Sequence, residues 1–376
     1  MIALQTDRIS HHRKFPDVSL DRYVRALQLV LHEFVEPRTT IYLDIKFWIS
    51  LRDVVLGRPT LPGAVDLLRK LRDGVAAGEL LCPICESTFS ELMKQADGVT
   101  RLATAKLIDE LSLGIALTDY FTRANTELAC LLHADLPPES RYESDQLVWT
   151  KTAYVLGQVH PSNTAFDAPT ELALQKAFVD VMWDVTLSDM VEILDLANKP
   201  GSGFGELAMS LNDQNEQHAD ELKSFQQTYE IESQGAVDCL LPVAEQIMQK
   251  RFKDKFGTQQ QPTEAELELG NNQLRQFLIS ALNSDQAKAV LRTMHISTAL
   301  HAYLRWNKGQ QWRENHFYDL HHAAAAIGYC ELFFTEHGLK GWLTSGLLKL
   351  DQVYGCQVAS SYQEALTLLA SKASDS

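Results

Sequence analysis

The spacing of apolar and polar residues divides the chain into three parts. Near the start, short apolar runs alternate with segments of helical spacing, and the same alternation returns in the last part of the chain. Such alternation is typical of α/β proteins with parallel strands. From Arg101 to about Gly309 the spacing is helical and predicts no strand. We therefore expect one α/β domain, assembled from both ends of the chain, with a large all-helical insertion.

Four apolar runs are typical of buried strands: Thr40–Leu43, Leu80–Ile84, Leu332–Thr335 and Tyr354–Ala359. The predicted helices include one capped by Ser19 and further ones at 47–56, 62–78, 87–95, 101–132, 144–159, 284–306, 317–329 and 361–370. The predicted segments are an N-terminal tail and helix (1–35), the first half of the α/β domain (36–130), the helical insertion (131–283) and the second half of the domain (284–376).

Composition narrows the class of protein. Hydrophobic residues make up 45% of the 376 residues and charged residues 22%, which is typical of a globular chain. The 34 basic and 49 acidic side chains leave a formal net charge of −15, which argues against a protein that coats nucleic acid through bulk positive charge. A nuclease stays open, because carboxylates that hold metal ions add negative charge locally.

Localisation follows from what the sequence lacks. No apolar run reaches the roughly 18 residues that span a bilayer, and the first residues have no apolar signal-peptide core. Six cysteines are too few for a disulfide scaffold in a chain of this length. We expect a cytoplasmic protein without a membrane partner.

Four carboxylates fall at corresponding places in the predicted α/β parts. Asp44 ends the first strand, Glu91 lies on the helix after the second, Asp319 opens the helix before the third, and Glu336 ends that strand. Ligands of open parallel sheets collect at the carboxyl ends of the strands. Clustered carboxylates repel one another, and a divalent cation relieves that repulsion. The pattern predicts a metal site suited to phosphodiester hydrolysis.

Each acid also has a simpler interpretation. Asp44 is equally typical of a turn or an N-cap, and Glu91 of a solvated helix position, with Glu86 as its neighbour in the same helix. Asp319 is close in sequence to His316 and His322, with which it could pair, and Glu336 precedes a turn at Gly338. The prediction therefore depends on the common placement of the four acids.

Three stretches resemble motifs of PIN-like domains. They are IYLDIKFWISLRD, LLCPICESTFSELMK and ENHFYDLHHAAAAIGYCELFFTEHGL, and together they cover about residues 36–97 and 284–370. The resemblance implies a three-layer PIN-like fold and a divalent-metal-dependent ribonuclease that uses Mg²⁺ or Mn²⁺. It also implies that Asp44, Glu91, Asp319 and Glu336 are the metal ligands and the catalytic residues, and it selects Glu91 over Glu86.

The sequence departs from the family pattern at two places. Asn315-His316 stands where an Asn-Asp pair is common, and Thr335-Glu336 where Thr-Asp is common. A Glu reaches one methylene further than an Asp, so Glu336 remains a candidate ligand and Glu331 a second one. We expect Asn315, His322 and Glu331 to surround the ligands, and Lys46 and Arg305 to contact phosphates.

Other chemistry remains open. Cys82 and Cys85 form a CxxC at a strand-to-helix turn, typical of redox or zinc proteins, but no second pair is present and buried packing explains them. The predicted substrate is RNA. Two alternatives are a DNA nuclease and a non-catalytic PIN-like scaffold that binds a protein partner, and an inhibitor protein is a further candidate partner. A Lys or Arg paired with the acids would favour the scaffold.

Overall fold

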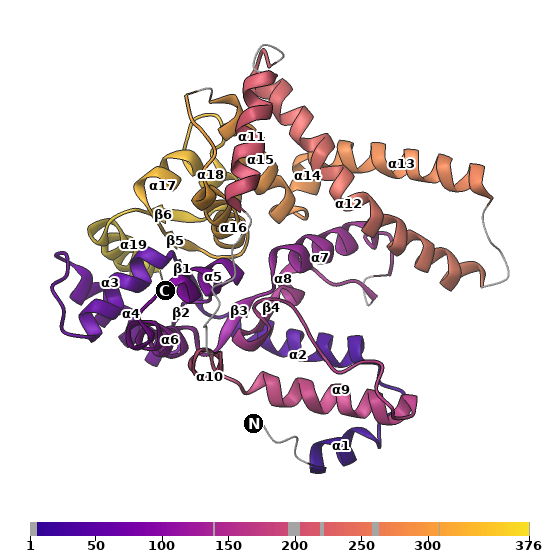
Figure 1. The fold of residues 1–376 in the computed structure, drawn as a ribbon, viewed down its shortest axis with the longest axis horizontal. Coiled ribbons are helices and arrows are strands. Elements are labelled where there is room, and N and C mark those ends of the chain that lie inside the picture. Colours follow the sequence, from indigo (N-terminus) through magenta and orange to yellow (C-terminus); the bar gives the residue numbers. More distant parts are fainter. Residues whose placement is uncertain are drawn as a thin grey trace.

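The centre of the molecule is a small parallel sheet built from both ends of the chain. The computed structural model describes residues 6–137, 140–194, 204–218, 222–257, 263–307 and 309–375. Its four main strands lie in the order β2-β1-β5-β6, and β1 pairs with β5 through Ile41–Leu332 and Leu43–Phe334. The strands are β1 (Thr39–Leu43), β2 (Leu80–Leu81), β5 (Leu332–Phe334) and β6 (Gln357–Ala359). The predicted α/β class is confirmed (Figure 1).

Helices cover both faces of this sheet. Tyr42 and Phe333 pack with α15 (Arg292–Trp306) and α16 (Glu314–Tyr329). Ile41, Leu43 and Phe334 face the opposite layer. That layer consists of α3 (Ile45–Val55), α4 (Ala64–Ala76), α6 (Gly98–Ser112) and α19 (Tyr362–Asp375). Strands that are covered on both faces contain apolar runs rather than alternation, as in Ile41–Leu43 and Leu332–Phe334.

A large helical part extends away from the sheet (Figure 1). In it, α7, α12, α13 and α15 share a core that includes Leu128, Val237 and Leu278. The remaining helices are α1 (Thr6–His12), α2 (Leu20–Val35), α5 (Glu86–Lys94), α7 (Tyr120–Leu132), α8 (Ser144–Leu147), α9 (Ala168–Trp183), α10 (Leu187–Ile193), α11 (Phe204–Gln217), α12 (Phe225–Phe256), α13 (Glu264–Leu282), α14 (Asp285–Lys288), α17 (His337–Leu343) and α18 (Leu350–Tyr354). None of the described helices is long and apolar enough to cross a membrane.

The expectation of no strand between Arg101 and Gly309 was wrong. β3 (Ile115–Leu117) and β4 (Trp149–Lys151) form an antiparallel pair, so the insertion predicted at 131–283 is not all-helical. β3 also touches the end of the second strand through a parallel bridge between Ile84 and Ala116. Leu111 and Ile115 keep helical spacing across the break, which hid the strand. The signal was Gly114, whose φ of 69° ends α6 in a left-handed turn.

Several element boundaries also differ from the prediction. Ser19 does cap α2, accepting a hydrogen bond from the Arg22 amide at 3.2 Å. The polar tail, however, contains α1. The predicted helix at 144–159 is divided into α8, the strand β4 and a short 3-10 helix, Thr152–Tyr154. α16 starts at Glu314, so Asp319 lies in its second turn rather than at its start. Tyr354 closes α18, and the last strand begins at Gln357. The sequence also predicts two chain breaks from Gly- and Pro-containing polar stretches, at 198–203 and 257–262. Except for Gly257, which follows α12, they lie outside the described residues.

Candidate metal centre at the carboxyl ends of the strands

The order of the strands defines where a ligand can bind. From β1 the chain moves to β2 on one side and later returns as β5 on the other side. The crevice at such a reversal, outside the carboxyl ends of the strands, is the usual ligand site of open parallel sheets. Asp44 directly follows β1, and Thr335 and Glu336 directly follow β5. The two predicted strand-end acids therefore flank the reversal point.

Asp44 does not act as a simple helix cap. It occupies the N-cap position of α3, but its side chain makes no capping hydrogen bond. Instead its Oδ2 accepts a hydrogen bond from Thr335 Oγ1 at 2.8 Å, and only 4% of the residue is exposed. Glu336 likewise precedes α17 without capping it, and it is exposed. The simpler interpretation of Asp44 as a cap thus does not describe its contacts.

Two helices bring the other groups to the same place. Glu91 lies on α5, and Asp319 and His322 lie one turn apart on α16. His322 Nε2 is 2.7 Å from Glu91 Oε2. Asp44, Glu91 and His322 each offer one ligand atom, and these atoms lie within 4.8 Å of one another, close enough to share a single ion. His322 is therefore part of the cluster itself and not only a neighbour of it.

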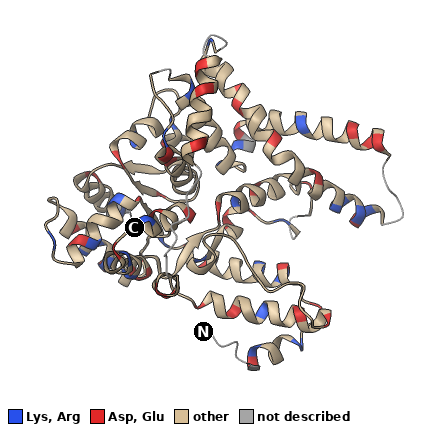
Figure 2. Cartoon of the chain, viewed as in Figure 1, with Lys and Arg blue, Asp and Glu red and all other residues tan. Residues whose placement is uncertain are grey.

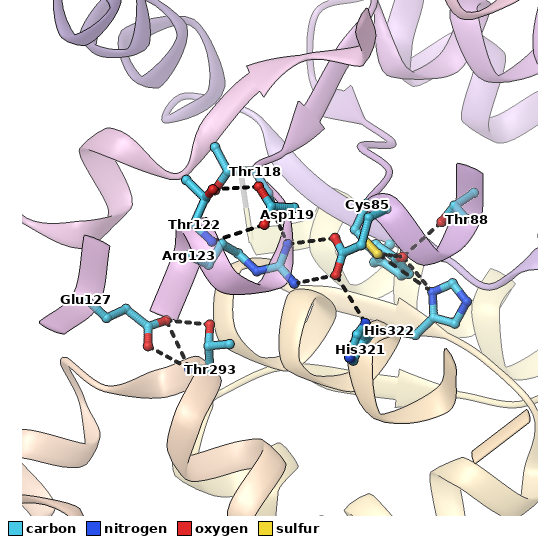
Figure 3. A network of polar contacts seen from close by, with 12 residues as sticks. Cys85, Thr88, Thr118, Asp119, Thr122, Arg123, Glu127, Thr293, His321 and His322 are labelled. Atoms are coloured by element: carbon cyan, nitrogen blue, oxygen red, sulfur yellow. Dashed lines mark hydrogen bonds and ion pairs between the residues drawn. The ribbon is translucent and has the colours of Figure 1, made fainter. Parts of the chain in front are cut away.

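The orientation of His322 is set from the sheet. Its Nδ1 lies 2.7 Å from the hydroxyl of Tyr42 on β1. That hydroxyl also contacts Thr88 Oγ1 at 2.9 Å and Cys85 Sγ at 2.8 Å. Figure 3 shows Cys85, Thr88 and His322 grouped around this hydrogen-bond centre. Because His322 is 1% exposed and held at Nδ1, its Nε2 is directed at the acids.

The electrostatics join the four predicted acids into one group. Burial raises the pKa of Asp319 to about 7; His322 acts in the opposite direction, and the charges of Asp44, Glu91 and Glu336 raise it further. For His322, burial lowers the pKa, but hydrogen bonds and charges of Cys85 and Glu91 outweigh it, and the pKa lies well above its ordinary value. Asp319 thus feels the charges of the other three acids, as expected where carboxylates gather.

No lysine or arginine in the described part of the chain forms an ion pair with any of these four acids. Among the described residues, their one ion-pair partner is the imidazole of His322, which contacts Glu91. The donor set, two to four carboxylates and one imidazole, suits a divalent cation. Figure 2 shows acidic and basic residues interspersed along the helices.

The other predicted residues lie in different places. Glu331 precedes β5, at the opposite end of the sheet, where it pairs with Lys372 at 2.5 Å. It therefore cannot replace Glu336. Arg305 pairs with Glu232 of α12 at 2.7 Å. Lys46 and Asn315 are both exposed. Lys46 lies two residues after Asp44, and Asn315 lies one helical turn before Asp319.

A second buried polar cluster lies beside the first. Glu86 of α5 pairs with Arg123 of α7 through contacts of 3.2 and 3.3 Å, and His321 Nδ1 is 3.5 Å from Glu86 (Figure 3). Arg123 is fully buried. Burial acts to lower the pKa of Arg123, but the Glu86 charge raises it above its ordinary value. Burial lowers the pKa of His321 to about 4, so this imidazole is neutral near pH 7.

Sequence reasoning missed Tyr42 and Arg123 and treated Cys85 only as packing. A tyrosine inside an otherwise aliphatic strand was the available signal, because a buried phenol needs a hydrogen-bond partner. Cys82 and Cys85 are both buried and unpaired, and burial raises the pKa of Cys82 well above its ordinary value. These thiols are therefore poor candidates for redox chemistry.

A cleft of about 1210 Å³ lies elsewhere, between α2, α7 and α12, and none of the four acids lines it. Its size does not make it the site, since it holds no comparable cluster of ligand groups. Comparison of the chain with family models, with curated proteins and with solved structures gave no match in any of the three.

Proposed function

We propose that the chain is a divalent-metal-dependent ribonuclease with a PIN-like fold, whose metal site is formed by Asp44, Glu91, Asp319 and Glu336. The observation that supports it most strongly is the convergence of acids from distant parts of the sequence at the strand reversal, with no lysine or arginine paired to them among the described residues. Acids that are gathered for a structural purpose are commonly paired with a protein cation. A binding site leaves that place for a ligand.

Asp44 and Glu91 fit the role of ligands best. Asp44 is fixed by the Thr335 hydroxyl and by its own amide, which donates to the Phe334 carbonyl at 2.9 Å. Fixed carboxylates lose little entropy when they bind a cation, and the ion supplies positive charge that favours attack on a phosphodiester. The ligand set Mg²⁺ or Mn²⁺ prefers, mainly oxygen, is present.

Glu336 and Lys46 form the solvent-facing side of the site. Glu336 is exposed beside Asp44 and is the acid most accessible to solvent. Lys46, exposed on the first turn of α3, is placed to meet a phosphate of a bound strand. The N-terminus of α3 directs its partial positive charge to the same edge, which favours an anion.

The test compares the wild-type chain with Asp44→Asn and Asp66→Asn. Asp66 is an exposed residue of α4 that pairs with Arg69 and is not part of the cluster, so Asp66→Asn controls for the loss of one negative charge. Single-stranded RNA and DNA of the same sequence are incubated with Mn²⁺ or Mg²⁺. We expect RNA cleavage by the wild type and by Asp66→Asn, and none by Asp44→Asn. Equal cleavage by all three, or none by any, contradicts the proposal, and exclusive cleavage of DNA replaces RNA as the substrate.

A further inference from the structure

His322 lies among the acids of the cluster, and its place there bears on which metal ion the site would bind. His322 is almost completely buried, and the groups around its Nε2 are the carboxylates of the cluster. An imidazole in this place either serves as an internal cation for Glu91 or is itself a ligand. The two roles differ in which ring nitrogens carry a proton: an internal cation is protonated at both, whereas a metal ligand is protonated at Nδ1 only.

The hydrogen bonds at the far side of the ring fit the ligand role. If Nδ1 carries the proton, it donates to the Tyr42 hydroxyl, which in turn donates to Thr88 Oγ1 or to Cys85 Sγ. Every group on the Nδ1 side is then satisfied, and Nε2 faces Glu91 and Asp44, where a bound ion would take the place of the 2.7 Å hydrogen bond to Glu91. Metal-binding histidines usually have their other ring nitrogen fixed by such a partner. Tyr42 is the positioning residue in this arrangement.

The internal-cation role explains less of the cluster. One imidazolium next to Glu91 leaves Asp44 without an ion-pair partner in the described part of the chain, and its charge does not offset the burial and the neighbouring acids that raise the pKa of Asp319. The neighbouring cluster shows how this protein neutralises a buried carboxylate when no ligand is needed, since Glu86 has a buried arginine.

We infer that His322 is a metal ligand beside Asp44 and Glu91, and that the site therefore takes a first-row transition ion such as Mn²⁺ or Zn²⁺ in preference to Mg²⁺. This inference rests on the proposed function. Mg²⁺ favours oxygen ligands only, whereas an imidazole ligand strengthens binding along the series from Mn²⁺ to Zn²⁺. The likeness to PIN-like domains, based on four acids, does not imply it.

The direct test detects the nitrogen ligand itself. Mn²⁺ or Cu²⁺ is added at one equivalent to the metal-free wild-type chain and to His322→Gln, and electron spin-echo modulation is used to detect coupling to an imidazole ¹⁴N. We expect the coupling in the wild type and its loss in His322→Gln, which removes the nitrogen ligand. Coupling of equal strength in His322→Gln comes from another histidine and overturns the inference.

Affinity gives the second readout. Calorimetric titration of wild type, His322→Gln and Tyr42→Phe with Zn²⁺, Mn²⁺ and Mg²⁺ should show the transition ions bound at least about tenfold more tightly than Mg²⁺ by the wild type. His322→Gln should lose more than about tenfold for Zn²⁺ and Mn²⁺ and little for Mg²⁺, and Tyr42→Phe should show a smaller loss of the same selectivity.

The outcomes separate this inference from the proposed function. If the wild type binds ions through Asp44 without a ¹⁴N coupling and without preference over Mg²⁺, the function stands and His322 is not a ligand. If neither the wild type nor Asp44→Asn binds any divalent ion, the proposed function and the inference about His322 both fail. Tyr42→Phe keeps the ring in the core, so a change in its metal preference does not arise from loss of the fold.

Discussion

Two buried polar clusters lie side by side on the same pair of helices and are balanced in opposite ways. α5 contributes Glu86 to one and Glu91 to the other, and α16 contributes His321 and His322. In the first cluster the fully buried Arg123 neutralises Glu86. In the second, acids gather with one imidazole and no lysine or arginine partner among the described residues. The first cluster is neutralised within the protein and links its helices, whereas the second gathers acids that could hold a cation.

The largest effect is expected from removing an acid of the second cluster. Asp44→Asn and Asp319→Asn should each lower single-turnover RNA cleavage by about 100-fold or more, because a bound ion supplies several kcal/mol of transition-state stabilisation. In the metal-free protein the same variants should unfold at an equal or higher temperature, since one repelling charge is gone. Thermal unfolding in the presence of a chelator measures this. A clear loss of stability in both variants would assign these acids a structural role.

The opposite result is expected in the first cluster. Arg123→Met leaves Glu86 buried without a cation and should lower the free energy of unfolding by about 3 kcal/mol or more. Adding Glu86→Gln should restore part of the loss. The matched control is Arg72→Met, whose pair with Glu110 is about half exposed and should cost less than about 1 kcal/mol. Urea unfolding of the four proteins measures the difference, and equal costs for Arg123 and Arg72 would remove the contrast between the clusters.

A smaller effect separates length from charge at the fourth acid. Glu336→Asp should weaken Mn²⁺ binding but keep some cleavage, because a water can fill the gap left by a shorter ligand. Glu336→Gln should lose far more, since the charge is gone. Mn²⁺ titration and single-turnover cleavage measure both variants. Wild-type behaviour of both would leave a site without Glu336 and assign this residue to the turn before Gly338.

Glu127 tests a third way of burying a carboxylate, by hydrogen bonds from hydroxyl and amide groups, with the charge of Arg123 acting from nearby. It accepts hydrogen bonds from the Thr293 amide and hydroxyl and from Tyr329. Burial raises its pKa to about 7, although these hydrogen bonds act to lower it. The pKa of the folded state lies above that of the unfolded state, so stability is full at low pH and is lost as the pH rises through this interval.

We therefore expect wild type to lose stability relative to Glu127→Gln between about pH 4.5 and pH 7, by on the order of 2 kcal/mol. Urea unfolding of the two proteins at several pH values provides the difference curve. Parallel curves over the whole interval would show that Glu127 titrates alike in both states.

Local patterns in the sequence determined the class of fold and the placement of the acids. Apolar runs located β1 and β5, and Asp44 and Glu336 follow them directly in the chain. The position of an acid at a strand end is a local property, and the pairing of parallel strands then brings such ends to one edge. The same reasoning located Glu91 on a helix after the second strand. It could not detect β3, whose three residues continue the helical spacing of α6.

Only the tertiary structure decided which side chains meet. His322 and Glu91 are separated by 231 residues, and Glu86 and Arg123 by 37, and no spacing rule connects either pair. Glu331 and Glu336 are both close to β5 in sequence, yet they lie at its opposite ends, because a strand carries its two ends away from each other. The contrast between a neutralised and an open cluster arises from packing α5, α7 and α16 together, since this packing sets which acids a buried arginine can reach.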